Sequence, residues 1–259
     1  MEHLLKKARV LNGILQNASA HVDFAAVASV LGELVRANVY LINDEGKVLG
    51  YSFLPGFSCQ TISEIVENAG FPRSYNQGLL DITETRANFR QHANSCVFDP
   101  DIPCRFSNAT VTVVPIVGAG TRLGTVVLAK FNRQFAASDL ILAEHGATVV
   151  GMEIFRSRME RMAEEARKRA AVQIALGTLS YSELDAVRHI FAELGKEEGL
   201  LIASKIADRV GITRSVIVNA LRKFESAGVI EARSLGMKGT YIKVLNDQLL
   251  EELKRYKQT

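Results

Sequence analysis

A basic segment near the C-terminus carries the side chains best suited to bind a polyanion. Residues 201–245 hold eight Lys or Arg side chains and three Asp or Glu side chains. Gly211 separates two short helical patterns, 202–210 and 213–226, and a glycine there permits the sharp turn of a helix–turn–helix. The segment therefore predicts a DNA-binding element.

The second predicted helix has two chemically different faces. Its apolar face consists of Val216, Ile217, Ala220, Leu221 and Phe224. Its opposite face carries groups that can bond base edges and phosphates, and we predict that it meets DNA. The residues on this face are Arg214, Ser215, Val218, Asn219, Arg222 and Lys223. Thr213 is expected to cap the helix.

A β-hairpin is expected to follow this helix and to form a wing. Two strand-type runs, 229–234 and 240–244, flank Gly236 and Gly239, with Lys238 at the tip. A solvated helix with incidental charge is the alternative interpretation, but the turn, the polar face, the wing and the local charge all favour DNA binding. The other predicted DNA contacts are Ala203, Ser204, Lys205, Arg209, Thr213, Lys238 and Thr240.

Three cysteines and a histidine are the other groups that could do chemistry. Cys59, His92, Cys96 and Cys104 do not have the spacing of a standard zinc site, so we expect thiols that line a loop or pocket and no metal. A thiol reductase is a second class, but its chemistry would need no helix–turn–helix. No phosphate-binding G-x-x-x-x-G-K-[ST] loop is present. We therefore expect a protein without catalytic residues.

Length and charge favour two domains. The chain has 259 residues and a formal net charge of +3. Residues 1–155 hold 12 basic and 14 acidic side chains, whereas residues 156–259 hold 19 basic and 14 acidic ones. No apolar run reaches the ~20 residues of a membrane helix, and three cysteines make no disulfide framework. We therefore expect a cytoplasmic protein without membrane contact.

Residues 1–155 show the pattern of an α+β domain. An amphipathic stripe over 4–15 and a helix capped by Asp23 come first. Two hairpins follow, 39–51 and 110–131, and between them lie a helical stretch and a polar loop at 86–109. The pattern favours an antiparallel sheet with helices on one side. GAF and PAS sensor domains have this arrangement and hold a small ligand between the sheet and a loop.

A long helix is expected to join this domain to the next. Ser138 is placed to cap it, and apolar residues continue along it at spacings of three, four and seven. Its later part is too polar for a core helix, so we interpret 156–178 as a helical linker between domains at 1–155 and 179–259. A capping box at Ser182–Asp185 is expected to open the first helix of the second domain.

The sequence resembles the CodY family of nutrient-sensing transcriptional regulators. The resemblance spans essentially the whole chain and is closest over 140–154, 180–194 and 201–245. It implies a GAF-like antiparallel-sheet effector domain, a linker helix and a winged helix–turn–helix over about Ala203–Arg222. It also implies a homodimer that binds A/T-rich operators, mainly as a repressor, in response to branched-chain amino acids and, in many members, GTP.

The resemblance also implies an amino-acid pocket. Its residues here would be Thr61, Ile62, Ile65, Phe71, Pro72, Cys96, Phe98 and Pro100. Thr61 stands where the family has an arginine that pairs with the ligand's carboxylate, and a hydroxyl cannot replace that bidentate charged pair. A branched-chain amino acid is the expected effector, and another small metabolite or a thiol-reactive signal is the alternative.

A nucleotide site is the last implication of the resemblance. The positions concerned are Asn43, Glu45, Glu153 and Arg158. Related proteins have basic residues where this chain has Asn43-Asp44-Glu45, and carboxylates repel a triphosphate. Glu153 matches the family, and Arg158 keeps a positive charge. The resemblance therefore implies GTP as an effector, whereas the carboxylates of Asp44 and Glu45 disfavour its binding.

Overall fold

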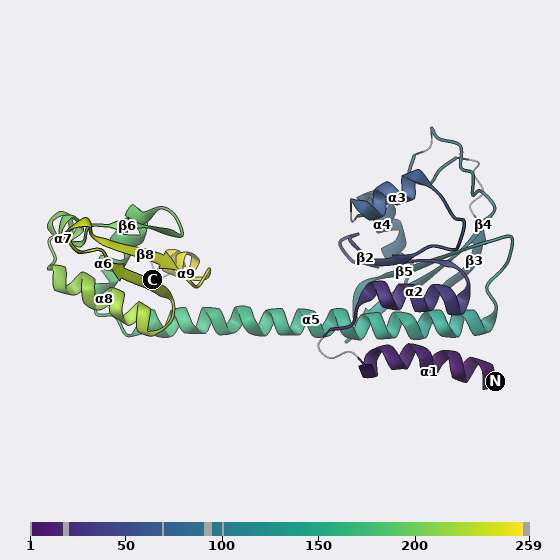
Figure 1. The fold of residues 1–259 in the computed structure, drawn as a ribbon, viewed down its shortest axis with the longest axis horizontal. Helices are drawn as coiled ribbons and strands as arrows, with labels where there is room; N and C mark the ends of the chain where they lie inside the picture. Colours follow the sequence, from purple (N-terminus) through teal and green to yellow (C-terminus); the bar gives the residue numbers. More distant parts are fainter. Residues whose placement is uncertain (1, 18–20, 69, 91–94, 100, 256–259) are drawn as a thin grey trace. The chain divides into compact units, whose positions relative to one another are not determined.

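Two units make up the chain, Met1–Arg158 and Met159–Thr259, and each is described by itself (Figure 1). The computed structural model describes residues 2–17, 21–68, 70–90, 95–99 and 101–255. Among these residues, no helix is both long and apolar enough to cross a membrane.

A five-stranded antiparallel sheet forms the centre of the first unit. Its strands are β1 (Asn38–Asn43), β2 (Val48–Ser52), β3 (Arg86–Arg90), β4 (Ala109–Gly118) and β5 (Thr121–Phe131). They are ordered β2-β1-β5-β4-β3. The β1–β2 and β4–β5 pairs are the two hairpins expected from the sequence, which confirms the antiparallel sheet.

Two helices, α2 (Phe24–Val35) and the start of α5 (Ala137–Gly177), cover one face of this sheet, and α1 (Glu2–Asn17) packs outside them (Figure 1). The core beneath them is fully buried at Leu31, Leu41 and Leu142. Asp23 caps α2 as expected, since its carboxylate accepts the Ala25 N–H at 2.9 Å.

The other face carries two further helices, α3 (Gln60–Glu67) and α4 (Arg73–Leu80) (Figure 1). The expectation of helices on one side only is therefore wrong. The physical reason lies in β1, where Leu41 faces the first core while Tyr40 and Ile42 belong to a second apolar cluster. Because both faces of the strand are apolar, each must be buried against helices.

Strand β3 and helix α4 correct the predicted sequence of elements. The stretch 86–109 was expected to be loop, but Arg86–Arg90 pairs with β4 at the edge of the sheet. Edge strands are half solvated, so a polar sequence is compatible with one. Arg122 holds the end of α4 against the sheet, where its guanidinium donates to the carbonyls of Leu79 (3.1 Å) and Ile82 (2.5 Å).

The long helix α5 begins at Ala137 and belongs to both units. Ser138 is therefore inside the helix and is not its cap. Instead Asp139 accepts the backbone N–H of Ala136 at 3.1 Å and bonds Lys130 at 2.5 Å. A carboxylate is favoured there by the positive end of the helix dipole.

The second unit packs helices on a small sheet. Its helices are α6 (Tyr181–Leu194), α7 (Ala203–Val210), α8 (Arg214–Ser226) and α9 (Leu249–Arg255). Its strands β6 (Glu198–Leu201), β7 (Ile230–Ser234) and β8 (Thr240–Val244) are ordered β6-β8-β7, and the short η1 (Gly236–Lys238) joins β7 to β8. Val172 and Leu176 of α5 are buried in the core of this unit. The end of α5 is thus part of the unit that follows it.

The capping box of α6 lies two residues earlier than expected. It is formed by Ser180 and Glu183, not by Ser182 and Asp185. Both reciprocal bonds are present: the Ser180 N–H donates to Glu183 Oε2 (2.7 Å) and the Glu183 N–H to Ser180 Oγ (3.3 Å). The S-x-x-E spacing satisfies two free N–H groups at the helix start.

Candidate DNA-binding surface and ligand pocket

Helices α7 and α8 form the helix–turn–helix, and Gly211 makes the turn between them. Gly211 follows α7 with a φ of 73°, a left-handed conformation that favours glycine. Thr213 is the N-cap residue of α8, although its side chain makes no capping bond. Ile217 and Phe224 are fully buried on one face of α8, so the opposite face lies at the surface.

Most of the residues predicted to contact DNA are available on this surface. The exposed ones are Ser204, Lys205, Arg209, Thr213, Arg214, Ser215, Asn219, Arg222 and Lys238. Val218, Lys223 and Thr240 are half-buried, and Ala203 is buried in the core. The Ala203 side chain is therefore not on the surface with the others.

Two of the predicted DNA contacts are already paired with carboxylates. Arg209 bonds Glu193 at 3.2 Å between two exposed side chains, a kind of ion pair that contributes little to stability. Lys223 bonds Glu183 Oε2 at 2.7 Å and the Thr178 carbonyl at 2.9 Å. The bond from Lys223 holds the pKa of the Glu183 carboxyl below its usual range, with help from the Ser180 N–H.

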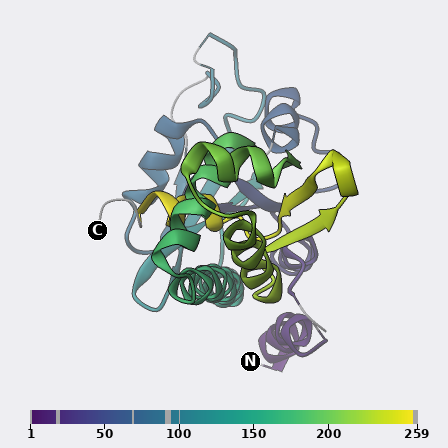
Figure 2. The ribbon, with the colours of Figure 1, turned by 90° about the vertical axis from the view of Figure 1, so that its left-hand side faces the viewer.

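The wing is the β7–β8 hairpin, which Figure 2 shows beside the helices of the second unit. Gly239 is needed at the end of its turn, because its φ is 110° and a Cβ there would lie 2.4 Å from the Leu201 carbonyl oxygen. This close approach fixes the hairpin against β6 and leaves Lys238 exposed at the turn. The arrangement of helix, turn, helix and wing is the one that the sequence predicts.

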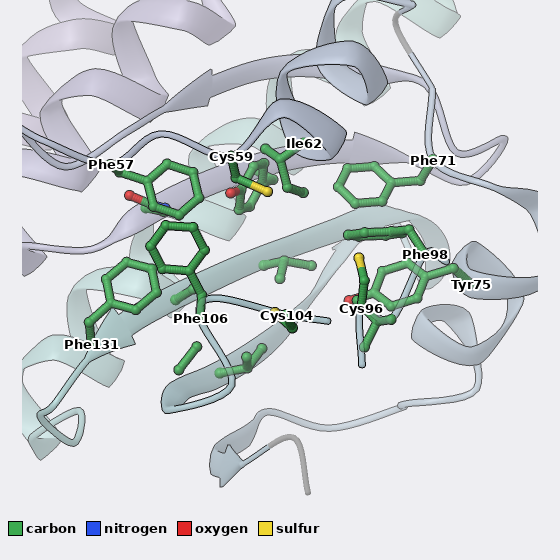
Figure 3. Close-up of a pocket in the computed structure, with 17 residues that line it drawn as sticks. Phe57, Cys59, Ile62, Phe71, Tyr75, Cys96, Phe98, Cys104, Phe106 and Phe131 are labelled. Atoms are coloured by element: carbon green, nitrogen blue, oxygen red, sulfur yellow. The ribbon is translucent and has the colours of Figure 1, made fainter. Parts of the chain in front are cut away.

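An apolar pocket lies on the α3–α4 side of the first unit's sheet (Figure 3). Its volume is about 110 Å³. A water molecule needs about 10–15 Å³ on the same measure, so the pocket has room for a small metabolite's side chain. Two aromatic groups flank the pocket. One consists of Phe57, Phe106 and Phe131, and the other of Phe71, Tyr75 and Phe98.

Neutral polar groups complete the lining. Burial raises the pKa of Tyr40, and burial together with nearby Cys96 raises the pKa of Tyr75 to about 12, so both phenols stay protonated. Asn38 is fully buried; its Oδ1 accepts the Leu54 N–H at 2.7 Å, and its side chain also interacts with the Tyr40 phenol. Among the residues described, none that line the pocket is charged. The pocket therefore selects by shape, with a few neutral donors.

The structure brings together only part of the predicted ligand set. Ile62, Phe71, Cys96 and Phe98 line the pocket. Ile65 packs in the adjoining apolar cluster. Thr61 on α3 and Pro72 at the start of α4 are outside the lining. Pro100 is outside the described residues.

The sequence reasoning missed the sheet side of the pocket. Residues of three neighbouring strands line it: Asn38, Tyr40, Ala109, Val111, Val127, Ala129 and Phe131. The available signal was the spacing of two along each strand, which places Asn38 and Tyr40 on the same face.

All three cysteines line this pocket, although Cys59 is far from Cys96 and Cys104 in sequence. All three are free thiols. Among the described residues, no three His, Cys, Asp or Glu side chains are grouped so as to hold a metal ion. His92 is outside the described residues.

The positions predicted to meet a nucleotide are occupied by contacts within the protein. Asn43 Oδ1 accepts the N–H groups of Glu45 (3.1 Å) and Lys47 (2.7 Å) and so holds the β1–β2 turn. Arg158 bonds Asp44 at 2.5 Å. The cation that a phosphate would need already has a carboxylate partner.

Glu153 belongs to a separate cluster. It is 4% exposed and bonds Arg156 at 2.9 Å and His21 at 3.1 Å. Burial raises the pKa of this carboxyl, but the bonds from Arg156 and His21 outweigh burial and leave the pKa below its usual value. Glu45 is exposed.

Known proteins match the chain in both units. The CodY GAF-like domain matches residues 3–178, and the CodY helix-turn-helix domain matches residues 197–257. The global transcriptional regulators CodY of Clostridium acetobutylicum and Clostridium botulinum are 57% and 56% identical to it, over 99% of this chain and 100% of each relative.

A solved structure is also similar to the first unit. The cofactor-binding GAF domain of the nutrient sensor CodY from Clostridium difficile is 33% identical, with a TM-score of 0.39, and the match covers 58% of this chain and 97% of that one.

A GAF-type sensing domain joined by a long helix to a winged helix–turn–helix defines a ligand-responsive transcription regulator. The relatives that match over the full chain are regulators, so this class replaces the thiol reductase considered from the sequence. The chain belongs to the CodY family of global transcriptional regulators.

Proposed function

We propose that this protein represses transcription by seating α8 in the major groove of an A/T-rich operator. The observation that carries the proposal is the exposed polar face of α8, where Asn219 and Arg222 lie opposite the buried Ile217 and Phe224, together with the exposed Arg214 in the first turn. Arginine and asparagine can each form bidentate bonds with base edges. The remaining contacts proposed are the exposed members of the predicted set on α7, at Thr213 and Ser215, and at the wing tip.

We further propose that a branched-chain amino acid is the effector and that it enters the pocket of the first unit. An apolar cavity of about 110 Å³ with aromatic walls favours a branched aliphatic side chain. Burial of such a side chain contributes about 1.5–3 kcal/mol. The buried amide of Asn38, beside the Tyr40 phenol, is a neutral polar group that a ligand oxygen could meet. Another small metabolite of similar shape remains the alternative for this pocket.

GTP is a weaker candidate for the same regulator. The Asp44–Arg158 ion pair and the two bonds accepted by Asn43 use the groups that a triphosphate would otherwise meet. We therefore propose that the amino-acid pocket carries the effector response. We propose that 1–155 senses the ligand and 179–259 binds DNA, and that 156–178 links them, with its last turns packed in the core of the second unit.

A cytoplasmic homodimer is the proposed working form. Met152, Phe155, Met159 and Met162 are exposed large apolar side chains along one helix, at spacings of three and four. Such a stripe favours a helix-to-helix contact between two copies. Sedimentation equilibrium of the wild type and of a Met159→Glu variant tests this: the wild type should be a dimer and the variant should dissociate.

The central experiment is calorimetry of the full-length chain against isoleucine, leucine, valine and GTP, followed by DNA binding in the presence of each. Binding of one branched-chain amino acid that changes DNA affinity would support the proposal. Binding of GTP with no response to the amino acids would contradict it.

A further inference from the structure

Lys223 differs from its neighbours on α8 because its charge is already used inside the protein. Its ammonium donates to Glu183 Oε2 at 2.7 Å and to the Thr178 carbonyl at 2.9 Å. Its side chain is 39% exposed and that of Glu183 only 10%. The preceding residue, Arg222, is exposed and lies on the face proposed to meet DNA.

The two partners of Lys223 lie at the ends of two other helices. Thr178 directly follows Gly177, the last residue of α5, and a cation is favoured at this negative end of a helix. Glu183 lies in the first turn of α6 and forms the capping box with Ser180. One ammonium group therefore joins α8 to the end of α5 and to the start of α6. We call this group, Thr178, Ser180, Glu183 and Lys223, the Lys223 clasp.

The electrostatics of the clasp argue against a phosphate contact. A lysine that binds a phosphate strengthens DNA binding largely by releasing counterions from the DNA. A lysine with a carboxylate at 2.7 Å already has its charge largely neutralised, so a phosphate gains less from it than from an exposed cation without such a partner. If the ammonium turned away toward a phosphate, the largely buried Glu183 carboxylate would lose its cation.

We propose that Lys223 is a positioning residue of the recognition helix: the Lys223 clasp fixes how α8 is presented relative to the end of α5 and the start of α6. This inference rests on the proposed seating of α8 on DNA. It assigns to Lys223 a role different from that of Arg222, which we expect to contact a phosphate.

The test compares three variants of the full-length chain, Lys223→Met, Glu183→Gln and Arg222→Met. Glutamine at position 183 removes the charge but suits the capping box, so α6 keeps its start. The probe is the duplex that the wild type enriches from a random library, and its affinity is measured by fluorescence anisotropy across a series of KCl concentrations. Thermal unfolding followed by circular dichroism shows that each variant is folded at the temperature used.

Lys223→Met and Glu183→Gln should both lower the affinity for the selected duplex by about tenfold, the size of one weakened base contact. They should leave the slope of log affinity against log salt unchanged. Affinity for mixed-sequence DNA should change little, because a misplaced helix loses base contacts more than phosphate contacts. Arg222→Met should reduce the slope by about 0.9, the value for one lost phosphate contact.

Two results would overturn the inference. One is a smaller salt slope in Lys223→Met, as in Arg222→Met. The other is tighter DNA binding by Glu183→Gln, which would mean that the carboxylate withholds Lys223 from DNA. Failure of the proposed DNA-binding role is distinguishable, because the wild type would then enrich no duplex and Arg222→Met would change nothing.

Discussion

The two units meet their partners with opposite kinds of surface. The ligand pocket is lined by neutral groups, and its phenols are kept protonated by burial. The proposed DNA surface carries exposed cations such as Arg214, Arg222 and Lys238. Salt screens exposed charges over about 10 Å at 0.1 M ionic strength, whereas shape and desolvation respond little to it. Substitutions that change charge should therefore alter the DNA affinity of the second unit strongly. In the first unit they should alter ligand affinity only where they place a charge at the pocket.

The largest expected effect is that of a negative charge at Ser215. This exposed residue lies in the first turn of α8, beside Arg214. Ser215→Asp and Ser215→Glu should abolish specific DNA binding, because repulsion from the phosphates outweighs the gain from the helix dipole. A phosphate on Ser215, with about −1.5 to −2 charges, should act in the same way.

Ser215→Ala is the matched control and should lose much less affinity in a gel-shift titration. Isoleucine binding by the acidic variants should match the wild type, because the pocket belongs to the other unit. Wild-type DNA affinity in Ser215→Asp would show that this turn of α8 is not at the interface.

Arg214→Ala should have the next largest effect on DNA binding. We expect a loss of about 1–3 kcal/mol in specific affinity if its guanidinium reads a base edge. The fold should be unchanged, since Arg214 is exposed while Ile217 and Phe224 form the buried face. Gel-shift titration, with circular dichroism as the control, measures this. Equal affinities for wild type and variant would remove Arg214 from the reading surface.

Thr61→Arg tests the neutral character of the pocket directly. Thr61 lies in the first turn of α3, between the lining residues Cys59 and Ile62. An arginine there could pair with the carboxylate of isoleucine, and a gain of about 1.4 kcal/mol is a tenfold change in the dissociation constant. Calorimetry should therefore show about tenfold tighter binding.

Thr61→Gln is the control for side-chain length without charge. Tight isoleucine binding by the wild type would mean that other groups, such as Asn38 Nδ2, already hold the carboxylate. No gain from Thr61→Arg would favour an uncharged ligand for this pocket.

The same contrast explains what the sequence could predict. The winged helix–turn–helix occupies one continuous stretch, and its signals are local: Gly211 at the turn, the two-faced pattern of α8, and Gly239 at the wing. The engagement of Lys223 was not predictable, because Glu183 lies 40 residues away in the sequence. The capping box was misplaced because serines at 180 and 182 both have an acidic residue three positions later.

The pocket was harder to predict because distant segments build it. Ile62, Phe71, Cys96 and Phe98 were identified through the family resemblance, whereas Tyr40 and Phe131 enter from strands whose second face was not expected to carry helices. Strand β3 escaped prediction since an edge strand needs no apolar pattern. In both cases the outcome depends on packing against segments that are distant in the sequence, which the local spacing of residues does not encode.

Lys238→Ala should have the smallest effect on DNA affinity. It also gives the most direct comparison between the charged DNA surface and the neutral ligand pocket. Lys238 is a single exposed charge at the wing tip, in the short turn that joins β7 to β8. Loss of one phosphate contact should reduce the slope of log affinity against log salt by about 0.9. The affinity for different duplexes should fall by the same factor, since a phosphate contact carries no sequence information. Isoleucine binding should be independent of salt in the variant and in the wild type alike, because the pocket lining is uncharged. A fall in affinity confined to one duplex would instead mean that the wing reads bases, and it would place part of the specificity outside α8.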